Sequence, residues 1–259
     1  MSGRVGSITT DIVSDGLEFN VDPANRASYT PNSTHFKSTL NLSETGSFVN
    51  DTSFLSPPVS ASCFSFDGVD DYTRIPIPVE AYKKSTIRTF GFWAKINTLN
   101  TFTPLLGDIG TGGSLFRYAN SFGFKSNYLY WVLEGLSAPS QACWARSSDD
   151  LSSIVGDNNW HYYAFFNPVT DNDVDRANIA NCKIWLDGSP LSLSINEGTT
   201  SVVRGFTGGA LVQGAGNQGS HSGQYYFHGE TANIHYYPRE LSNSEVLHNY
   251  NALRGRFGL

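Results

Sequence analysis

Short alternations of apolar and polar residues run through most of the chain and are separated by turn residues. Period-two alternation of this kind is typical of β-strands that bury one face. We expect two strands within residues 63–75 and further strands within 16–29, 86–96, 103–109, 115–118, 122–125, 128–133, 141–146, 160–166, 182–186, 191–195, 210–213 and 224–237. Because no amphipathic helices intervene between these segments, the pattern predicts a β-sandwich or barrel rather than an α/β fold.

Local turn chemistry adds detail to this pattern. The pair Asp67-Gly68 lies between two strand patterns in residues 63–75 and suits the positive-φ geometry of a tight turn, so we expect a β-hairpin there. The pair at residues 187–188 is also Asp-Gly and predicts a second hairpin turn. Residues 30–58 are rich in Ser, Thr and Asn with scattered Phe and Leu. This composition predicts an ordered but irregular surface loop with weak strands, not a disordered linker.

Two segments have a helical pattern. Residues 242–253 begin with Ser242 and carry Glu245 three positions later, which is the spacing of a capping box. Pro238 before this segment and Gly255 after it bound the predicted helix. The apolar residues on one face of it are Val246, Leu247, Tyr250 and Leu253. Residues 78–84 are compatible with a single helical turn.

Composition and charge narrow the function classes. The 259 residues carry a formal net charge of −6 and contain no Lys/Arg cluster, so nucleic-acid binding is not expected. No segment is long and apolar enough to cross a bilayer, and residues 1–10 lack the pattern of a signal peptide. We expect no membrane insertion, one domain over residues 16–259, and an N-terminal arm over residues 1–15 that orders on a partner.

Three cysteines, Cys63, Cys143 and Cys182, have neither CxxC spacing nor a nearby His pattern. A zinc site is therefore not expected, and the thiols are predicted to be small buried hydrophobic groups. A Cys63–Cys182 disulfide remains an open alternative at this point.

Five separated motifs provide a family resemblance: FDGVDDY at 66–72, FGFWAK at 90–95, NWHYYA at 159–164, KIWLDG at 183–188, and the final strand with its helix at 227–246. In their order and spacing they resemble the laminin-G-like, concanavalin-A-like jelly-roll family. The resemblance covers the chain from about residue 16 to the C-terminus. It implies an all-β fold in which two antiparallel sheets form a jelly-roll sandwich with a short C-terminal helix.

The C-terminal sequence carries a second resemblance. Residues 249–259 are similar to the C-termini of laminin-G-like proteins of tailed phages, including cyanophages, in which such domains are virion structural components. This implies a location in the virion and phage capsid or tail proteins as partners. It also implies a homo-oligomer or multiple copies on the particle, with host-surface glycans as further partners.

Glycoside hydrolases of the laminarinase type share the sandwich fold, so their catalytic motif is the one to compare with this sequence. Their two carboxylates lie on one strand in a Glu-x-Asp-x-x-Glu arrangement, and no such arrangement occurs here. Gly-x-Ser-x-Gly, His-Glu-x-x-His and phosphate-binding Gly-Lys-Ser/Thr motifs are also absent, and the six histidines are dispersed. We therefore expect that the protein is not an enzyme.

Calcium is the metal that the resemblance implies, because laminin-G-like domains often hold it through loop carboxylates and backbone carbonyls. Asp70 and Asp71 are the candidate ligands. Many family members carry an acidic pair where this chain has Ala232 and Asn233, so the alternative is that Asp70 and Asp71 are solvated or cap a turn. No cofactor is otherwise required.

A sugar-binding surface needs exposed aromatic rings beside polar groups. The candidates are Tyr128, Tyr130, Trp131, Trp144, Asn217, Gln218 and His221, the last three in a Gly-rich loop. The alternative is that residues 128–131 form a strand whose apolar side belongs to the core. Trp160 and Trp185, in contrast, are expected in the core, and Arg239 is expected to pin the last strand to the helix.

These observations predict a non-catalytic virion structural protein of a tailed phage, either a capsid decoration protein or a tail or appendage subunit, with glycan-adhesive activity. A free carbohydrate-binding lectin module is the alternative. A laminarinase-like hydrolase is a third possibility, against which the missing carboxylate arrangement argues.

Overall fold

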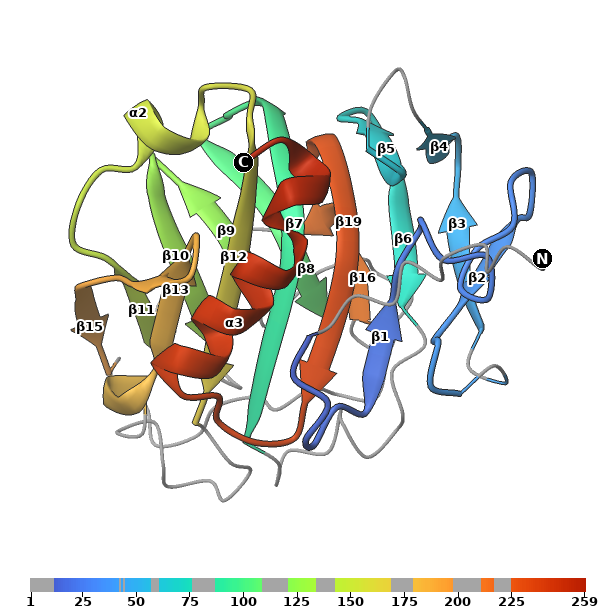
Figure 1. Ribbon diagram of the computed structural model, residues 1–259. Coiled ribbons are helices and arrows are strands. Elements are labelled where there is room, and N and C mark those ends of the chain that lie inside the picture. The colour runs from blue at the N-terminus through green and yellow to red at the C-terminus, as the bar shows by residue number, and fades with distance from the viewer. Residues whose placement is uncertain are drawn as a thin grey trace.

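Two antiparallel β-sheets pack face to face in the computed structural model, which describes residues 12–41, 43, 45–56, 61–75, 87–108, 121–133, 143–168, 179–197, 211–216 and 225–259. The C-terminal helix crosses the outside of one sheet (Figure 1). This arrangement confirms the predicted all-β jelly-roll sandwich. None of the helices in these ranges is long and apolar enough to span a membrane.

Sheet A is the sheet under the helix. Its strands run in the order β14 (Ser189–Pro190), β13 (Lys183–Leu186), β12 (Trp160–Asn167), β7 (Arg88–Thr98), β19 (His228–Tyr237), β5 (Cys63–Asp67) and β4 (Ser53–Leu55), with β1 (Phe19–Val21) also paired to β19. As the apolar run within it predicts, β7 lies at the centre of this sheet between β12 and β19.

Sheet B forms the other layer. Its order is β15 (Leu193–Asn196), β11 (Cys143–Ser147), β10 (Tyr128–Leu133), β9 (Ser121–Lys125), β8 (Phe102–Asp108), β16 (Leu211–Gln213), β6 (Tyr72–Ile75), β3 (Thr45–Val49) and β2 (His35–Lys37). A small separate pair, β17 (Ala215–Gly216) and β18 (Tyr225–Tyr226), lies against β8. The short helix α2 (Ser152–Val155) follows β11.

Aromatic rings fill the space between the sheets. Phe165 of sheet A stacks on Phe122 of sheet B, with ring centroids 4.3 Å apart. Trp131 stacks on the same Phe165 ring at 4.7 Å. Such pairs contribute about 0.5–1.5 kcal/mol each beyond the burial of their area. The inter-sheet core therefore holds strands from both sheets in one unit.

A second apolar cluster lies on the outside of sheet A, under α3 (Asn243–Leu253) and the 3-10 turn η3 (Arg254–Phe257). Trp93 of β7 stacks on Phe257 at 4.3 Å and on Tyr250 at 5.6 Å. The indole N–H of Trp185 donates to the side chain of Asn243 at 2.8 Å. Both Trp160 and Trp185 are buried, which confirms their prediction as core residues.

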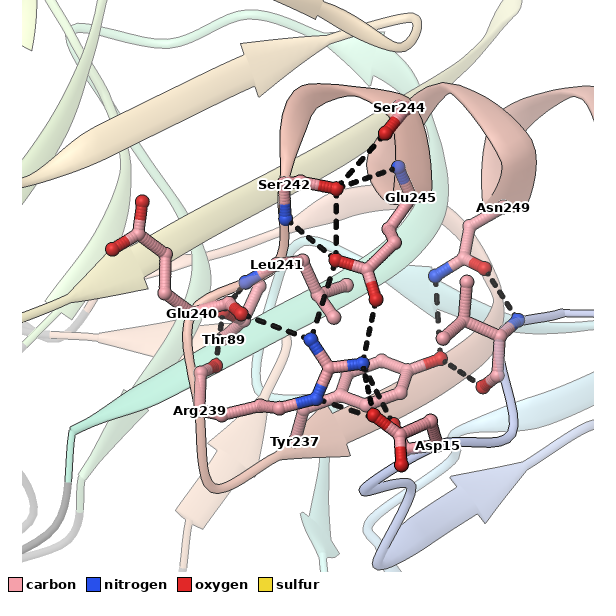
Figure 2. Close-up of polar contacts among 11 residues, drawn as sticks. Asp15, Thr89, Tyr237, Arg239, Glu240, Leu241, Ser242, Ser244, Glu245 and Asn249 are labelled. Carbon is pink, nitrogen blue, oxygen red and sulfur yellow. Dashed lines mark hydrogen bonds and ion pairs between the residues drawn. The ribbon is translucent and has the colours of Figure 1, made fainter.

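Polar contacts anchor the start of α3 (Figure 2). Ser242 and Glu245 form the predicted capping box, in which each side chain bonds the backbone N–H of the other residue. Arg239 donates to the Glu245 carboxylate at 2.6 Å and to the backbone carbonyl of Asp15 at 2.9 Å. The predicted role of Arg239 in pinning the last strand to the helix is thus confirmed.

The segment before β1 also packs on this end of the molecule. The hydroxyl of Tyr237 donates to the carbonyl of Val13 at 2.7 Å, and the Val13 N–H donates to the Asn249 side chain at 2.8 Å. Residues 12–15, the last part of the predicted arm, therefore lie against the last strand and α3. Residues 1–11 lie outside the described residues, as do the expected strand at 115–118 and the expected helical turn at 78–84.

The predicted hairpin at residues 63–75 is wrong. A tight turn does occur, with Gly68 at φ +82°. However, β5 pairs with β4 and β19 in sheet A, whereas β6 pairs with β3 and β16 in sheet B. The turn therefore carries the chain from one sheet to the other. Turn residues specify local backbone angles, but the burial of both flanking strands decides which partners they pair with.

Residues 30–58 contribute more to the sandwich than the predicted surface loop. They supply β2 and β3 at one edge of sheet B and β4 at the edge of sheet A. Phe36 is buried in the inter-sheet core, and Phe48 and Phe54 pack against it. The three cysteines are buried, as predicted for small hydrophobic groups, and none of them forms a disulfide, which excludes the Cys63–Cys182 alternative.

Candidate functional site

The outer face of sheet B presents aromatic side chains that α3 does not cover, because α3 lies on sheet A. Along β10, Leu129 and Trp131 point into the core, while Tyr128 and Tyr130 alternate with them on the outside and are half-buried. Strand β11 repeats the pattern, so that Trp144 and Arg146 face outward. Period-two alternation in two neighbouring strands thus builds one surface.

Cross-strand pairing brings these side chains together. Tyr130 is directly opposite Arg146 in the register of β10 and β11. The guanidinium carbon of Arg146 lies 4.2 Å from the ring centroid of Tyr128, 5.9 Å from that of Tyr130 and 5.7 Å from that of Trp144. The rings of Tyr130 and Trp144 are 5.5 Å apart and inclined by 59°. We call Tyr128, Tyr130, Trp144 and Arg146 the aromatic platform.

Polar residues border the platform. Strand β15 places Ser194 opposite Arg146 and Asn196 opposite Trp144. On the other side, β9 places Lys125 opposite Tyr128. Rings flanked by hydroxyl, amide and ammonium groups are the combination that lets a surface stack on a ligand and orient it by hydrogen bonds.

Arg146 has an unusual polar environment. Within the described part of the chain its side chain makes no ion pair or hydrogen bond, and its Nε is buried without an acceptor. Asp150, four residues later in the chain, does not pair with Arg146. Its carboxylate accepts hydrogen bonds from the Asn127 side chain at 3.1 Å and from the Ser152 backbone N–H at 2.8 Å. The three rings contact the guanidinium but give its Nε no hydrogen-bond acceptor.

Trp131 must be removed from the predicted glycan-binding residues. It is 1% exposed and stacks on Phe165 in the inter-sheet core. The physical reason is the side-chain period of a strand, because neighbours of an outward Tyr130 must point inward. Residues 128–131 therefore form a strand with two different sides: Leu129 and Trp131 belong to the core, and Tyr128 and Tyr130 lie on the surface.

The other predicted glycan residues, Asn217, Gln218 and His221, lie outside the described residues. Their loop connects β17 to β18, and Tyr225 at its end packs edge-on against Phe102 at 5.2 Å. Phe102 is opposite Lys125 on β9, and Lys125 is opposite Tyr128 on β10. The end of the loop is therefore two strands away from the platform.

The candidate calcium ligands lie in the turn that joins the two sheets. Carboxylate oxygens of Asp67, Asp70 and Asp71 are all within 4.8 Å of one another. Asp71 is 1% exposed; its Oδ2 accepts from the Asp67 N–H at 3.1 Å, and its Oδ1 is buried without a hydrogen-bond partner. The Asn50 side chain holds the turn by donating to the Asp70 carbonyl at 2.7 Å.

The electrostatics of this turn suit a cation. Burial raises the pKa of Asp71, backbone N–H groups of Asp67 and Asp51 oppose this rise, and the charges of Asp67 and Asp70 add to it. A hard divalent cation would compensate three close carboxylates and supply the partner that Asp71 Oδ1 lacks. The residues present therefore fit calcium.

Asn233 is one of the two positions at which the laminin-G-like resemblance leads us to expect an acidic pair. Its backbone has φ +43°, and its side chain donates to Asn20 at 3.3 Å and bonds His235 Nδ1 at 3.0 Å. These contacts fix the irregularity in β19 between Ala232 and His235. The amide thus has a structural role in the buried part of sheet A.

No protein-family model and no curated protein matches this sequence. Several solved structures match in three dimensions. The receptor binding domain of botulinum neurotoxin C/D mosaic serotype has a TM-score of 0.59 and 12% sequence identity. This match covers 92% of this chain and 52% of that chain. The binding domain of serotype D has a TM-score of 0.57 at 13% identity, with the same coverage. The likeness is one of fold. The chain spans about half the length of these neurotoxin chains.

A third match comes from a different functional class. A mutant of Trypanosoma rangeli sialidase that displays trans-sialidase activity has a TM-score of 0.56 at 15% identity, over 96% of this chain and 34% of that chain. Receptor-binding domains and a sialidase share the β-sandwich jelly roll, so the fold alone does not decide between binding and catalysis.

Sequence reasoning missed two of the residues described above. Arg146 was overlooked because it is an isolated charge, although its position two residues after Trp144 already places both on one face of a strand. Asp67 was treated as a turn residue, yet its carboxylate lies within the cluster formed with Asp70 and Asp71.

Proposed function

We propose that this protein is a non-catalytic binding module that recognises a carbohydrate through the aromatic platform. The observation that carries the proposal is the grouping of Tyr128, Tyr130 and Trp144 on a sheet face that α3 leaves uncovered. Sugar rings stack their C–H faces on aromatic side chains, and the polar residues of β15 and β9 stand where hydroxyl groups of such a ligand would lie.

The absence of paired carboxylates at the platform supports a non-catalytic role. Glycoside hydrolysis requires two carboxyl groups on either side of the scissile bond. On the parts of β9, β10, β11 and β15 that the structure describes, every outward position next to the rings is neutral or basic. A bound sugar would therefore meet no acid and base pair on these strands.

The structural neighbours support binding as the general function. Two are named as binding domains of neurotoxins, and one such domain was solved in complex with rat synaptotagmin II. The matched fold thus occurs in chains that are named for binding, although this chain covers only about half of each. For this chain, a glycan receptor on a cell surface is the partner that the aromatic platform suits.

The test is a glycan-array screen followed by titration calorimetry on the strongest sugar. Trp144→Ala and Tyr130→Ala are expected to weaken binding about tenfold each, which corresponds to about 1.4 kcal/mol. Tyr130→Phe retains the ring and is expected to keep most of the affinity, and Leu247→Ala removes an exposed apolar side chain on α3 as a remote control. Unchanged binding in both alanine variants would contradict the proposal.

We propose in addition that Asp67, Asp70 and Asp71 hold a calcium ion that stabilises the turn between β5 and β6. Calcium is expected to raise the melting temperature of the protein relative to EDTA-treated protein, because it binds only the folded turn. Asp70→Asn should abolish this shift, and the exposed Asp149→Asn should leave it unchanged. The same melting temperature in calcium and in EDTA would contradict the site.

The finer proposal is that the module is a tailed-phage virion subunit, on a capsid or a tail, where repeated copies would increase avidity for a glycan. Its support is the sequence resemblance of residues 249–259. Within those residues, Phe257 packs on Trp93 and Trp160, so part of the resemblance serves the fold itself. Mass spectrometry of purified particles tests this role, and absence of the chain from them would favour a free lectin.

A further inference from the structure

We infer that the aromatic platform selects an anionic saccharide and that Arg146 pairs with the carboxylate or sulfate group of this ligand. The inference rests on the proposed function and names the ligand class of the same site. It adds a charge requirement, since stacking on Tyr128, Tyr130 and Trp144 alone would accept neutral sugars.

The first argument is the set of contacts that Arg146 lacks. Two other described arginines satisfy their guanidinium groups with carboxylates: Arg239 with Glu245 at 2.6 Å and Arg256 with Asp22 at 2.6 Å. Among the residues that the structure describes, the Arg146 guanidinium has no carboxylate partner and lies beside three rings. A buried N–H without an acceptor costs about 1–3 kcal/mol, and the Nε of Arg146 is in this position.

The second argument is the direction of the missing bonds. Aromatic rings interact with the flat face of a guanidinium, whereas its N–H donors lie in its plane and match the two oxygens of a carboxylate. Because Nε is buried, the ring contacts leave the N–H donors of the two terminal nitrogens for another group. A carboxylated or sulfated sugar can use these donors and stack its ring on the platform at the same time.

The third argument is preorganisation. Arg146 lies on β11 between β10 and β15, so its backbone is fixed by pairing on both sides. Three rings surround its side chain, with the closest centroid at 4.2 Å. A charged group already held in place loses less conformational entropy on binding than a mobile surface side chain. Lys125, opposite Tyr128, adds a second positive charge at the border of the platform.

The experiment compares three probes that share one core: lactose, 3′-sialyllactose with a carboxylate, and 3′-sulfolactose with a sulfate. Oligogalacturonate and its methyl ester form a second matched pair that differs only in charge. The full chain is titrated with each probe at 50 and 300 mM NaCl. The variants are Arg146→Gln, Arg146→Lys, and the control Arg26→Gln, which removes an equal charge from an exposed site between β1 and β2.

We expect the charged probes to bind at least about tenfold more tightly than lactose or the methyl ester, and more weakly at high salt. Arg146→Gln should abolish this preference, Arg146→Lys should restore part of it, and Arg26→Gln should leave it unchanged. Preference for sialyllactose or oligogalacturonate identifies a carboxylate as the recognised group, whereas preference for sulfolactose identifies a sulfate. Either result supports the anionic class.

Two outcomes would overturn the inference, and they separate it from the proposed function. If neutral and charged probes bind equally and Trp144→Ala abolishes both, the platform binds sugars without charge selection. If charged probes bind equally well to Arg146→Gln and to the unmodified protein, the recognised charge lies elsewhere. Failure of all probes and of the glycan array would contradict the proposed function itself.

Discussion

The two outer faces of the sandwich are both rich in aromatic residues but differ in what covers them. On sheet A, Trp93 and Trp185 are fully buried under α3 and η3. On sheet B, Tyr130 and Trp144 remain half-buried, and the helix lies on the opposite side of the molecule (Figure 1). An aromatic strand pattern therefore indicates a surface that needs a partner. Whether this partner is part of the same chain decides between a core and a binding site.

The polar groups of the two faces differ in the same way. Under α3 the hydroxyl of Tyr162 is paired within the chain and lies 2.7 Å from His235 Nε2, whereas the indole N–H of Trp93 is buried without an acceptor. Burial lowers the pKa of His235 to about 3, so this pair is neutral at physiological pH. On sheet B the guanidinium of Arg146 is charged and has no acceptor in the described part of the chain. The faces therefore differ in charge, because the Tyr162–His235 pair under α3 is neutral, whereas Arg146 places a guanidinium among the rings of the open face.

The largest expected effect is the loss of a ring from the covered face. Trp93→Ala should lower the free energy of unfolding by about 3–5 kcal/mol, because it removes the surface on which Phe257 and Tyr250 stack and leaves a cavity. Trp144→Ala on the open face should cost less than about 1 kcal/mol. Urea denaturation of both variants measures the difference. Equal losses would show that both faces are core.

The next effect concerns the anchor of α3. The hydrogen bonds that Arg239 donates lower the pKa of Glu245 most, and the Ser242 backbone N–H lowers it further. Burial opposes them with a smaller effect, and the pKa falls from 4.5 to about 2. Because the folded-state pKa lies below the unfolded value, ionised Glu245 stabilises the fold above about pH 4.3, and this contribution is lost as the pH falls toward 2.

Denaturation between pH 6 and pH 2 measures this contribution. The unmodified protein should lose about 1–3 kcal/mol from this carboxylate, and Glu245→Gln should have a correspondingly flatter pH profile. Asp149→Asn, which changes an exposed acid, controls for net charge. An identical pH profile for Glu245→Gln and the unmodified protein would contradict the role of this ion pair in holding the cover of sheet A.

Local sequence signals predicted the elements well but not all of their partners. Two Asp-Gly pairs illustrate the limit. At Asp187-Gly188 both residues have positive φ, and Leu186 pairs directly with Ser189, so the signal produces a two-residue hairpin. At Asp67-Gly68 the same dipeptide joins strands of different sheets. Which sheet a strand enters depends on burial by distant segments, and these are not visible in a window of a few residues.

The same reasoning applies to the candidate site. Alternation within residues 128–133 was sufficient to place Tyr128 and Tyr130 on one face, and applying it strictly would have excluded Trp131. The pairing of β10 with β11 was not predictable from local patterns, although it brings Arg146 opposite Tyr130. The cover provided by α3 depends on where a helix at the end of the chain docks. Sequence alone therefore identified rings but could not distinguish the covered face from the open one.

The smallest expected change in stability provides the sharpest test of the comparison. If Arg146 served mainly to hold the strands of sheet B together, Arg146→Gln would cost more than 1 kcal/mol, as the loss of an engaged core residue does. We expect a change within about 0.5 kcal/mol. The lost ring contacts, about 0.5–1 kcal/mol at a surface site, are offset because the variant also removes the buried Nε that lacks an acceptor. Urea denaturation at pH 7 measures it. A side chain that contributes little to the fold, yet is held by three rings, is best explained by a ligand outside the chain.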